Sequence, residues 1–199
     1  MEDAHINVKV CSFFTPGPYA DEAVKLRLSL EELGIHHALK CVQFGAVSDP
    51  WRHAVMYKPA FILEQLMALE TEYDGVFWTD ADSICRCPPP WDTMKGVDFG
   101  YHRFRWSQSH PFEMLCGGLY FARDPRVCAF VSAWCANTPR FNGTDTPEQH
   151  SLGLTWDTWK TRLVGLDVGQ DWVHIFDAPH REGARPIFEH FQKSRTLRK

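Results

Sequence analysis

Two aspartates that follow a strongly apolar stretch are the residues of this chain best placed to do chemistry. Asp80 and Asp82 come directly after residues 75–79 (GVFWT), which have the character of a buried strand. Side chains two apart in a strand share a face, so we expect both carboxylates to point together from the strand's end. Such a pair is costly unless a cation lies between them or water covers them. The pattern predicts a divalent metal site at the carboxyl end of a strand, the edge where open α/β sheets bind ligands; solvated turn residues are the alternative.

The elements that would position this pair alternate along the chain. Apolar runs bounded by turn residues predict strands over residues 6–14, 38–44, 75–80, 97–101, 114–122, 163–168 and 172–177. Apolar residues at helical spacing, together with caps and first-turn prolines, predict helices over residues 21–33, from Lys58-Pro59 onward, after Asp124-Pro125 and from Thr146 onward. Strands that alternate with helices indicate a single α/β domain with a mainly parallel central sheet and helices on both faces.

Length and composition are those of a globular enzyme. The 199 residues, 44% hydrophobic and 23% charged, can bury a substantial core. No apolar run reaches the length of about 18 residues that predicts a transmembrane helix, and the first residues lack the pattern of a signal peptide. The seven cysteines are odd in number and mostly lie in apolar segments, as reduced thiols do. We therefore expect a cytoplasmic protein.

Charge is distributed unevenly along the chain. The net charge of −4 argues against nucleic acid as the default partner. The last seven residues nevertheless carry four positive charges, from Lys193, Arg195, Arg198 and Lys199. A tail of this kind can contact phosphate or an anionic membrane surface, although most such tails are solvated chain ends. Peripheral membrane contact through the tail is therefore kept as an open alternative.

The strand that ends in Asp80, Ala81 and Asp82 resembles the DxD motif of GT-A glycosyltransferases, whose Rossmann-like fold matches the expected α/β architecture. In that family the aspartates hold a metal that is carried in with a nucleotide-diphosphate sugar. Four blocks in the expected order, over residues 6–186, are similar to retaining family 8-like sugar transferases. The resemblance implies Mn²⁺ or Mg²⁺ as the cofactor, with Asp80, Ala81 and Asp82 at the donor and metal site.

The first two blocks would contact the donor. Phe14 and Thr15, at the end of the first strand, match the segment that holds the base and ribose in the family. Lys58, at the head of the expected helix before the aspartate strand, resembles a basic residue that such enzymes aim at the donor. A solvated first-turn lysine is an equally good explanation of Lys58.

The third block contains adjacent glycines in an apolar strand, Gly117 and Gly118. Glycine weakens a strand, so the pair needs a reason, and close approach of a ligand or a β-bulge would each supply one. We favour the ligand. Further along, Glu148 and Gln149 resemble the Asp-Gln pair that the family places beneath the transferring sugar, with Glu in place of Asp. Thr146 and Gln149 also have the spacing of a helix capping box, which needs no ligand.

The fourth block is residues 180–186 (HREGARP), which resemble the family's His-x-x-Gly-x-x-Lys-Pro segment. The resemblance makes His180 the third metal ligand, Gly183 a donor contact and Arg185 the group that holds the diphosphate. The spacing here is one residue shorter and Arg replaces Lys, which shifts Arg185 by roughly 3.5 Å along an extended chain. A lone loop histidine is usually a surface residue, and that explanation is the alternative for His180.

Together the blocks imply a hexosyltransferase that moves a sugar from a nucleotide-diphosphate sugar, with uridine diphosphate expected, and retains the anomeric configuration. Residues 1–100 would bind the nucleotide sugar, residues 101–190 would complete the metal site and bind the acceptor, and residues 191–199 form the basic tail. Glu148, Gln149 and Arg185 are the expected catalytic residues. The sequence does not identify the acceptor, which could be a saccharide, a protein, a small molecule or a nucleic acid.

Three other functions stay open. A glycosyltransferase that acts on DNA or a modified base is compatible with the basic tail, although the acidic body argues against long duplex contact. A non-catalytic nucleotide-sugar binder could share the fold. A phosphatase of the haloacid dehalogenase type also uses D-x-D after a strand, but that motif normally lies on the first strand, and here 79 residues precede it.

Overall fold

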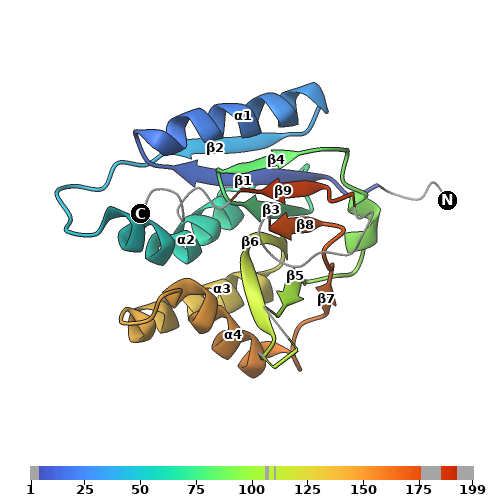
Figure 1. The fold of residues 1–199 in the computed structure, drawn as a ribbon. Coiled ribbons are helices and arrows are strands. Elements are labelled where there is room, and N and C mark those ends of the chain that lie inside the picture. The colour runs from blue at the N-terminus through green and yellow to red at the C-terminus, as the bar shows by residue number, and fades with distance from the viewer. Residues whose placement is uncertain (1–4, 106–107, 110, 176–184, 192–199) are drawn as a thin grey trace.

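A six-stranded sheet forms the centre of the protein, with the strand order β2-β1-β3-β6-β5-β7 (Figure 1). The computed structural model describes residues 5–105, 108–109, 111–175 and 185–191. The strands are β1 (Val8–Phe14), β2 (His37–Cys41), β3 (Gly75–Thr79), β5 (Phe99–Phe104), β6 (Glu113–Ala122) and β7 (Gly165–Asp167). β1 pairs in parallel with β2 and β3, and β5 with β7, whereas β6 is antiparallel to β3 and β5. The expected mainly parallel α/β sheet is confirmed.

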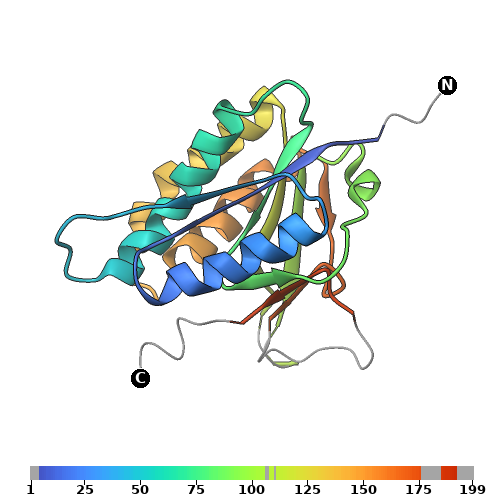
Figure 2. The same ribbon diagram turned by 90° about the horizontal axis from the view of Figure 1, so that it is seen from above.

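Helices cover both faces of this sheet, as expected (Figure 2). α1 (Pro18–Glu32) lies on one face, and α2 (Pro50–Met67), α3 (Pro125–Asn137) and α4 (Pro147–Trp159) lie on the other. Side chains along β3 alternate between the two faces of the sheet and so contribute to two hydrophobic cores. Trp78 packs in the core beneath α2–α4, and Phe77 packs in the core on the α1 side. None of the helices in the described part of the chain is long and apolar enough to cross a membrane.

The start of α2 differs from the sequence-based expectation. The helix begins at Pro50 rather than at Lys58, because Asp49 caps it by accepting a hydrogen bond from the Arg52 backbone N–H at 2.9 Å. Pro59 therefore lies inside the helix, where it cannot donate the usual backbone hydrogen bond. The consequence is that Lys58 is an interior residue of α2 and is buried.

A second, three-stranded sheet packs on the α1 side of the central sheet. Its order is β4-β9-β8, from β4 (Ser83–Cys85), β9 (Phe188–His190) and β8 (Val173–Ile175). β8 falls within the expected strand at 172–177, whereas β4 and β9 were not predicted. Phe188 stacks on Phe77 of the central sheet with ring centroids 4.8 Å apart. A short 3-10 helix, η1 (Trp91–Met94), follows β4, and another, η2 (Thr138–Phe141), links α3 to the segment before α4.

The adjacent glycines of β6 are explained by this packing. A Cβ atom at Gly118 would lie 2.2 Å from Cγ2 of Val173, and a Cβ atom at Gly117 would lie 2.7 Å from Nδ1 of His190. Both glycines thus make room for side chains of the second sheet. The protein's own packing accounts for the need for glycine here without a ligand, and the register of β5 against β6 also shifts at this stretch, between the Gly100–Tyr120 and His102–Leu115 pairs.

We expect Gly118→Ala to destabilise the protein by about 1–3 kcal/mol, because the added methyl group overlaps a branched side chain on the second sheet. The matched control is Gly153→Ala within α4, where nothing lies within 4 Å of the added Cβ and alanine should stabilise the helix by roughly 0.5–1 kcal/mol. Urea unfolding of both variants measures the two shifts. Equal stability of Gly118→Ala and the parent protein would contradict the packing of β6 against β8.

Candidate metal centre and substrate cavity

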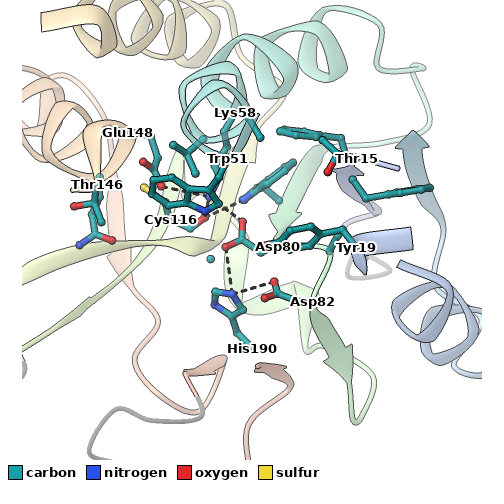
Figure 3. Close-up of a pocket in the computed structure, with 18 of the residues that line it drawn as sticks. Thr15, Tyr19, Trp51, Lys58, Asp80, Asp82, Cys116, Thr146, Glu148 and His190 are labelled. Carbon is teal, nitrogen blue, oxygen red and sulfur yellow. Dashed lines mark hydrogen bonds and ion pairs between the residues drawn. The ribbon is translucent and has the colours of Figure 1, made fainter. Parts of the chain in front are cut away.

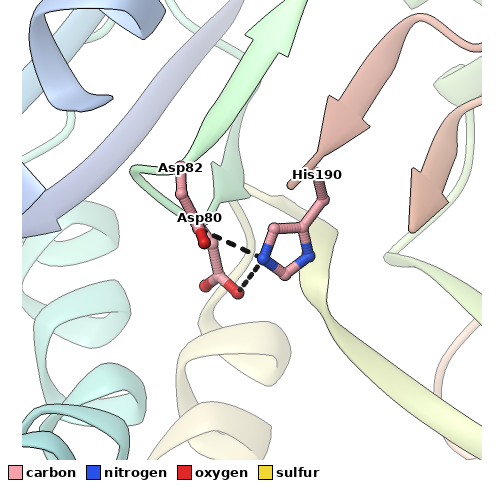
Figure 4. Close-up of side chains that lie close together, drawn as sticks. All are labelled: Asp80, Asp82 and His190. Atoms are coloured by element: carbon pink, nitrogen blue, oxygen red, sulfur yellow. Dashed lines mark ion pairs between the residues drawn. The ribbon is translucent and has the colours of Figure 1, made fainter. Parts of the chain in front are cut away.

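The pairing of two short strands brings a histidine to the aspartates. β4 begins at Ser83, directly after Asp82, and pairs antiparallel with β9 so that Ser83 lies opposite His190. The backbone N–H of Phe191 donates to the carbonyl oxygen of Asp82 at 3.0 Å. Nε2 of His190 consequently lies 3.1 Å from Oδ1 of Asp82 and 3.4 Å from Oδ2 of Asp80 (Figure 4).

These three side chains fit a divalent metal ion. One ligand atom from each of Asp80, Asp82 and His190 lies within 4.8 Å of the others. Two carboxylate oxygens and one imidazole nitrogen form a donor set that suits Mn²⁺. Burial alone would lower the pKa of His190, but the charges of Asp82 and Asp80 raise it above its ordinary value. A proton and a metal ion therefore compete for the same nitrogen.

Lys58 connects this centre to the rest of the cavity. Its Nζ lies 2.8 Å from Oδ1 of Asp80 and 3.7 Å from Oε1 of Glu148, and it donates to the carbonyl oxygen of Cys116 at 3.2 Å. Burial disfavours the ammonium group, but the charges of Asp80 and Glu148 raise the pKa of Lys58 above its ordinary value. The solvated first-turn lysine considered from the sequence is therefore wrong.

Glu148 and His190 each have one buried polar atom without a hydrogen-bond partner among the described residues, Oε2 and Nδ1 respectively. The side chain of Glu148 is 7% exposed. Burial raises the pKa of Glu148, and the neighbouring Lys58 offsets part of that effect. Trp134 of α3 holds the start of α4 in place by donating from Nε1 to the Glu148 carbonyl oxygen at 2.9 Å.

The predicted capping box at the start of α4 is wrong. Thr146 occupies the cap position but makes no capping hydrogen bond through its side chain. Nε2 of Gln149 instead donates to Oε2 of Glu113 on β6, at 2.7 Å. The Gln149 amide thus links α4 to the first residue of β6 instead of capping the start of α4.

A cavity of about 640 Å³ contains the metal ligands and these groups (Figure 3). Of the site residues expected from the sequence, the cavity is lined by Phe14, Thr15, Lys58, Asp80, Ala81, Asp82, Gly117, Glu148 and Gln149. The figure shows Thr15 and Tyr19 on one side, Glu148 and Thr146 on the other, and Asp80 between them. The structure therefore brings together donor and catalytic candidates that come from five separate segments of the chain.

Four of the expected site residues are not found among the described residues that line the cavity. Gly118 and Arg185 are not among the described residues that line the cavity, and Arg185 is exposed. His180 and Gly183 lie outside the described residues, so their roles as metal ligand and donor contact stay predictions. The basic tail of residues 192–199 also lies outside the described part of the chain.

Sequence reasoning missed His190 and Trp51, which both belong to the cavity lining. Once residues 188–190 are known to form a strand, His190 shares a face with Phe188 and points toward the central sheet, but no local pattern predicts that strand. Trp51 was missed because the start of α2 was placed too late in the chain.

Comparison with known proteins gives a likeness at the level of the fold. No protein-family profile matches the sequence, and no curated protein sequence matches it. The chain is similar to a solved structure described as "a glycosyltransferase involved in the glycosylation of the major capsid of PBCV-1", with a TM-score of 0.69. The match has 12% sequence identity and covers 94% of this chain and 93% of that chain. At this identity, what the two proteins are shown to share is the fold.

Proposed function

We propose that the protein is a metal-dependent glycosyltransferase that moves a sugar from a nucleotide-diphosphate sugar to an acceptor. The observation that carries the proposal is the convergence of Asp80, Asp82 and His190 in a large cavity at the carboxyl end of β3. The fold shared with a glycosyltransferase supports it. Uridine diphosphate as the nucleotide, Mn²⁺ as the ion, retention of configuration and a cytoplasmic location are parts of the proposal that rest on the sequence.

The cavity offers two different surroundings for the two ends of such a donor. Phe14, Thr15 and Tyr19 give one side an aromatic and hydroxyl character suited to a base and ribose. Glu148 and Gln149, at the start of α4, give the other side the carboxylate and amide that sugar hydroxyls bind. The metal ligands lie between these sides, where the diphosphate would be held (Figure 3).

The cavity residues would have separate roles in the transfer of the sugar. The bond between the sugar C1 and the diphosphate oxygen breaks with positive charge growing on the sugar and negative charge on the departing diphosphate. A metal ion held by Asp80, Asp82 and His190 would supply Lewis acidity at that diphosphate. Lys58 fixes Asp80 and Glu148 through its ion pairs and so orients one metal ligand and the carboxylate beside the sugar. Glu148 would stabilise the oxocarbenium-like sugar in the transition state.

The C-terminal segment completes the proposal. Arg185 is proposed to add positive charge beside the diphosphate, His180 to act as a metal ligand and Gly183 to contact the donor. Arg185 is exposed and is not among the described residues that line the cavity, so this part of the proposal rests on the sequence resemblance.

We expect slow release of nucleotide from the proper donor in the presence of Mn²⁺ even without an acceptor, because water can replace the missing nucleophile. EDTA should stop the release, since it removes the ion from the carboxylates and imidazole. The measurement is nucleotide release across a panel of sugar nucleotides, with and without EDTA and with candidate saccharide acceptors.

The other functions give different results in the same panel. Tight donor binding without turnover across a broad set of acceptors would favour a nucleotide-sugar binder. Phosphate release from simple phosphomonoesters would favour the phosphatase. Transfer to a DNA oligonucleotide, but not to saccharides, would favour the DNA-directed enzyme.

A further inference from the structure

The described lining of the cavity is strongly acidic. It carries one lysine, Lys58, and one histidine, His190, against six carboxylates, from Asp49, Asp80, Asp82, Glu113, Asp145 and Glu148. Lys58 already pairs with Asp80 and Glu148, and Asp49 pairs with Arg52, whose Nε lies 3.4 Å away. A metal ion would balance Asp80 and Asp82 only. Among the described residues, Glu113 and Asp145, toward the start of α4, are therefore the lining carboxylates that no ion pair or metal would balance.

A second observation indicates that a ligand belongs on this side. Oε2 of Glu148 is buried and has no hydrogen-bond partner among the described residues, and the side chain lines the cavity (Figure 3). A buried acceptor without a partner is unfavourable, and a hydroxyl group of a ligand would satisfy it.

The neighbouring groups are also hydrogen-bond acceptors. Gln149 uses Nε2 to donate to Oε2 of Glu113, and this bond leaves the amide oxygen of Gln149 as the acceptor for other partners. Glu113, Glu148 and Gln149, together with the hydroxyl of Thr146, form what we call the α4 side of the cavity. Sugar hydroxyls can donate to each of these groups, whereas a carboxylate or phosphate on the ligand would face like charge.

We propose that the α4 side accepts the sugar of the donor and selects an uncharged sugar against a uronic acid or another anionic sugar. The inference rests on the proposed transfer from a nucleotide sugar and names the class of sugar that is transferred. Glu113 is the specificity-determining residue: its charge is not balanced by any ion pair that the described residues make, and its hydrogen bond with Gln149 holds it at the start of α4.

The test compares matched pairs of donors that differ only at C6 of the sugar, such as uridine diphosphate glucose and uridine diphosphate glucuronate, and the guanosine pair with mannose and mannuronate. Calorimetry with Mn²⁺ measures both members of each pair on the wild-type protein. For the base that binds, we expect the uronate to bind at least about tenfold more weakly, because a carboxylate would lie within several ångströms of the charge on Glu113.

Glu113→Gln tests the residue itself. The substitution keeps an oxygen that accepts from Gln149 and removes the charge, so the preference for the neutral sugar should fall by about threefold or more. The matched control is Asp157→Asn, which removes one charge from the exposed face of α4, where Asp157 pairs with Lys160 at 2.8 Å. The control should leave the preference unchanged.

The outcomes separate this inference from the function on which it rests. Equal or tighter binding of the uronate by the wild-type protein would overturn the inference and leave the glycosyltransferase proposal standing. An unchanged preference in Glu113→Gln would overturn the assignment to the α4 side. If no sugar nucleotide binds in the presence of Mn²⁺, the proposed function falls and the inference falls with it.

Discussion

Replacing Asp82 with asparagine should abolish transfer and weaken Mn²⁺-dependent donor binding by on the order of 100-fold or more. Asn has almost the same shape as Asp, so the chain should fold, but the variant loses one of the two negative charges that face Nε2 of His190. Calorimetry with donor and Mn²⁺ measures the binding, and circular dichroism establishes that the variant is folded. Asp80→Asn should behave similarly and should in addition weaken the ion pair with Lys58.

The control for this experiment is again Asp157→Asn, which removes a charge from a side chain that is 69% exposed. It should leave metal and donor binding unchanged. A folded Asp82→Asn protein that still binds donor with the full dependence on Mn²⁺ would falsify the assignment of the metal centre.

Replacing Lys58 with methionine should lower the free energy of unfolding by about 3–5 kcal/mol and remove activity. The side chain is buried and pairs with Asp80 and Glu148, so methionine fills the space but leaves two carboxylates without their positive partner. Urea unfolding measures the change in stability, and nucleotide release measures the activity.

The loss of stability in Lys58→Met should depend on pH. Burial raises the pKa of Glu148 in the folded protein, and removing Lys58 takes away the charge that opposes this effect. A carboxyl group whose folded pKa is raised stabilises the fold at low pH, and that stabilisation is lost as pH rises through the folded pKa. The variant should therefore be closer to the wild type at about pH 5 than at about pH 8.

Lys40→Met is the matched control for Lys58→Met. Lys40 approaches Glu64 at 4.0 Å, but both side chains are half exposed, so the pair contributes about 0–1 kcal/mol. If Lys58→Met changed stability no more than Lys40→Met, the buried network of Lys58, Asp80 and Glu148 would not exist in solution.

The central sheet could be predicted because its strands are local apolar runs. β3 and β6 have continuous buried sequences bounded by turn residues, and the pattern alone identifies them. β4 and β9 have three residues each and include the polar residues Ser83 and Glu189. β4 pairs with β9 across about half of the chain, β9 also pairs with β8, and no local pattern records these pairings.

The contrast between local patterns and long-range pairing also explains which site residues could be predicted. Asp80 and Asp82 were expected from a local pattern, Lys58 and Glu148 from the family resemblance, and the structure places all four together. His190 depends on the register between β4 and β9, which cannot be read from either segment alone. The start of α2 is a different case, because the cap and first-turn proline at Asp49-Pro50 are visible in the sequence, whereas the prediction rests on the later proline, Pro59.

The register that places His190 opposite Ser83 couples ligand binding to the second sheet. Asp82 immediately precedes β4, and His190 is the last residue of β9, so a ligand that holds both side chains also holds the two strands in register. Local opening of β4 from β9 separates the ligand-binding groups, and the free energy of binding is added to the free energy of that opening. Ligand binding at the cavity and the pairing of β4 with β9 are therefore thermodynamically linked: a ligand stabilises the pairing, and a change that weakens the pairing also weakens ligand binding.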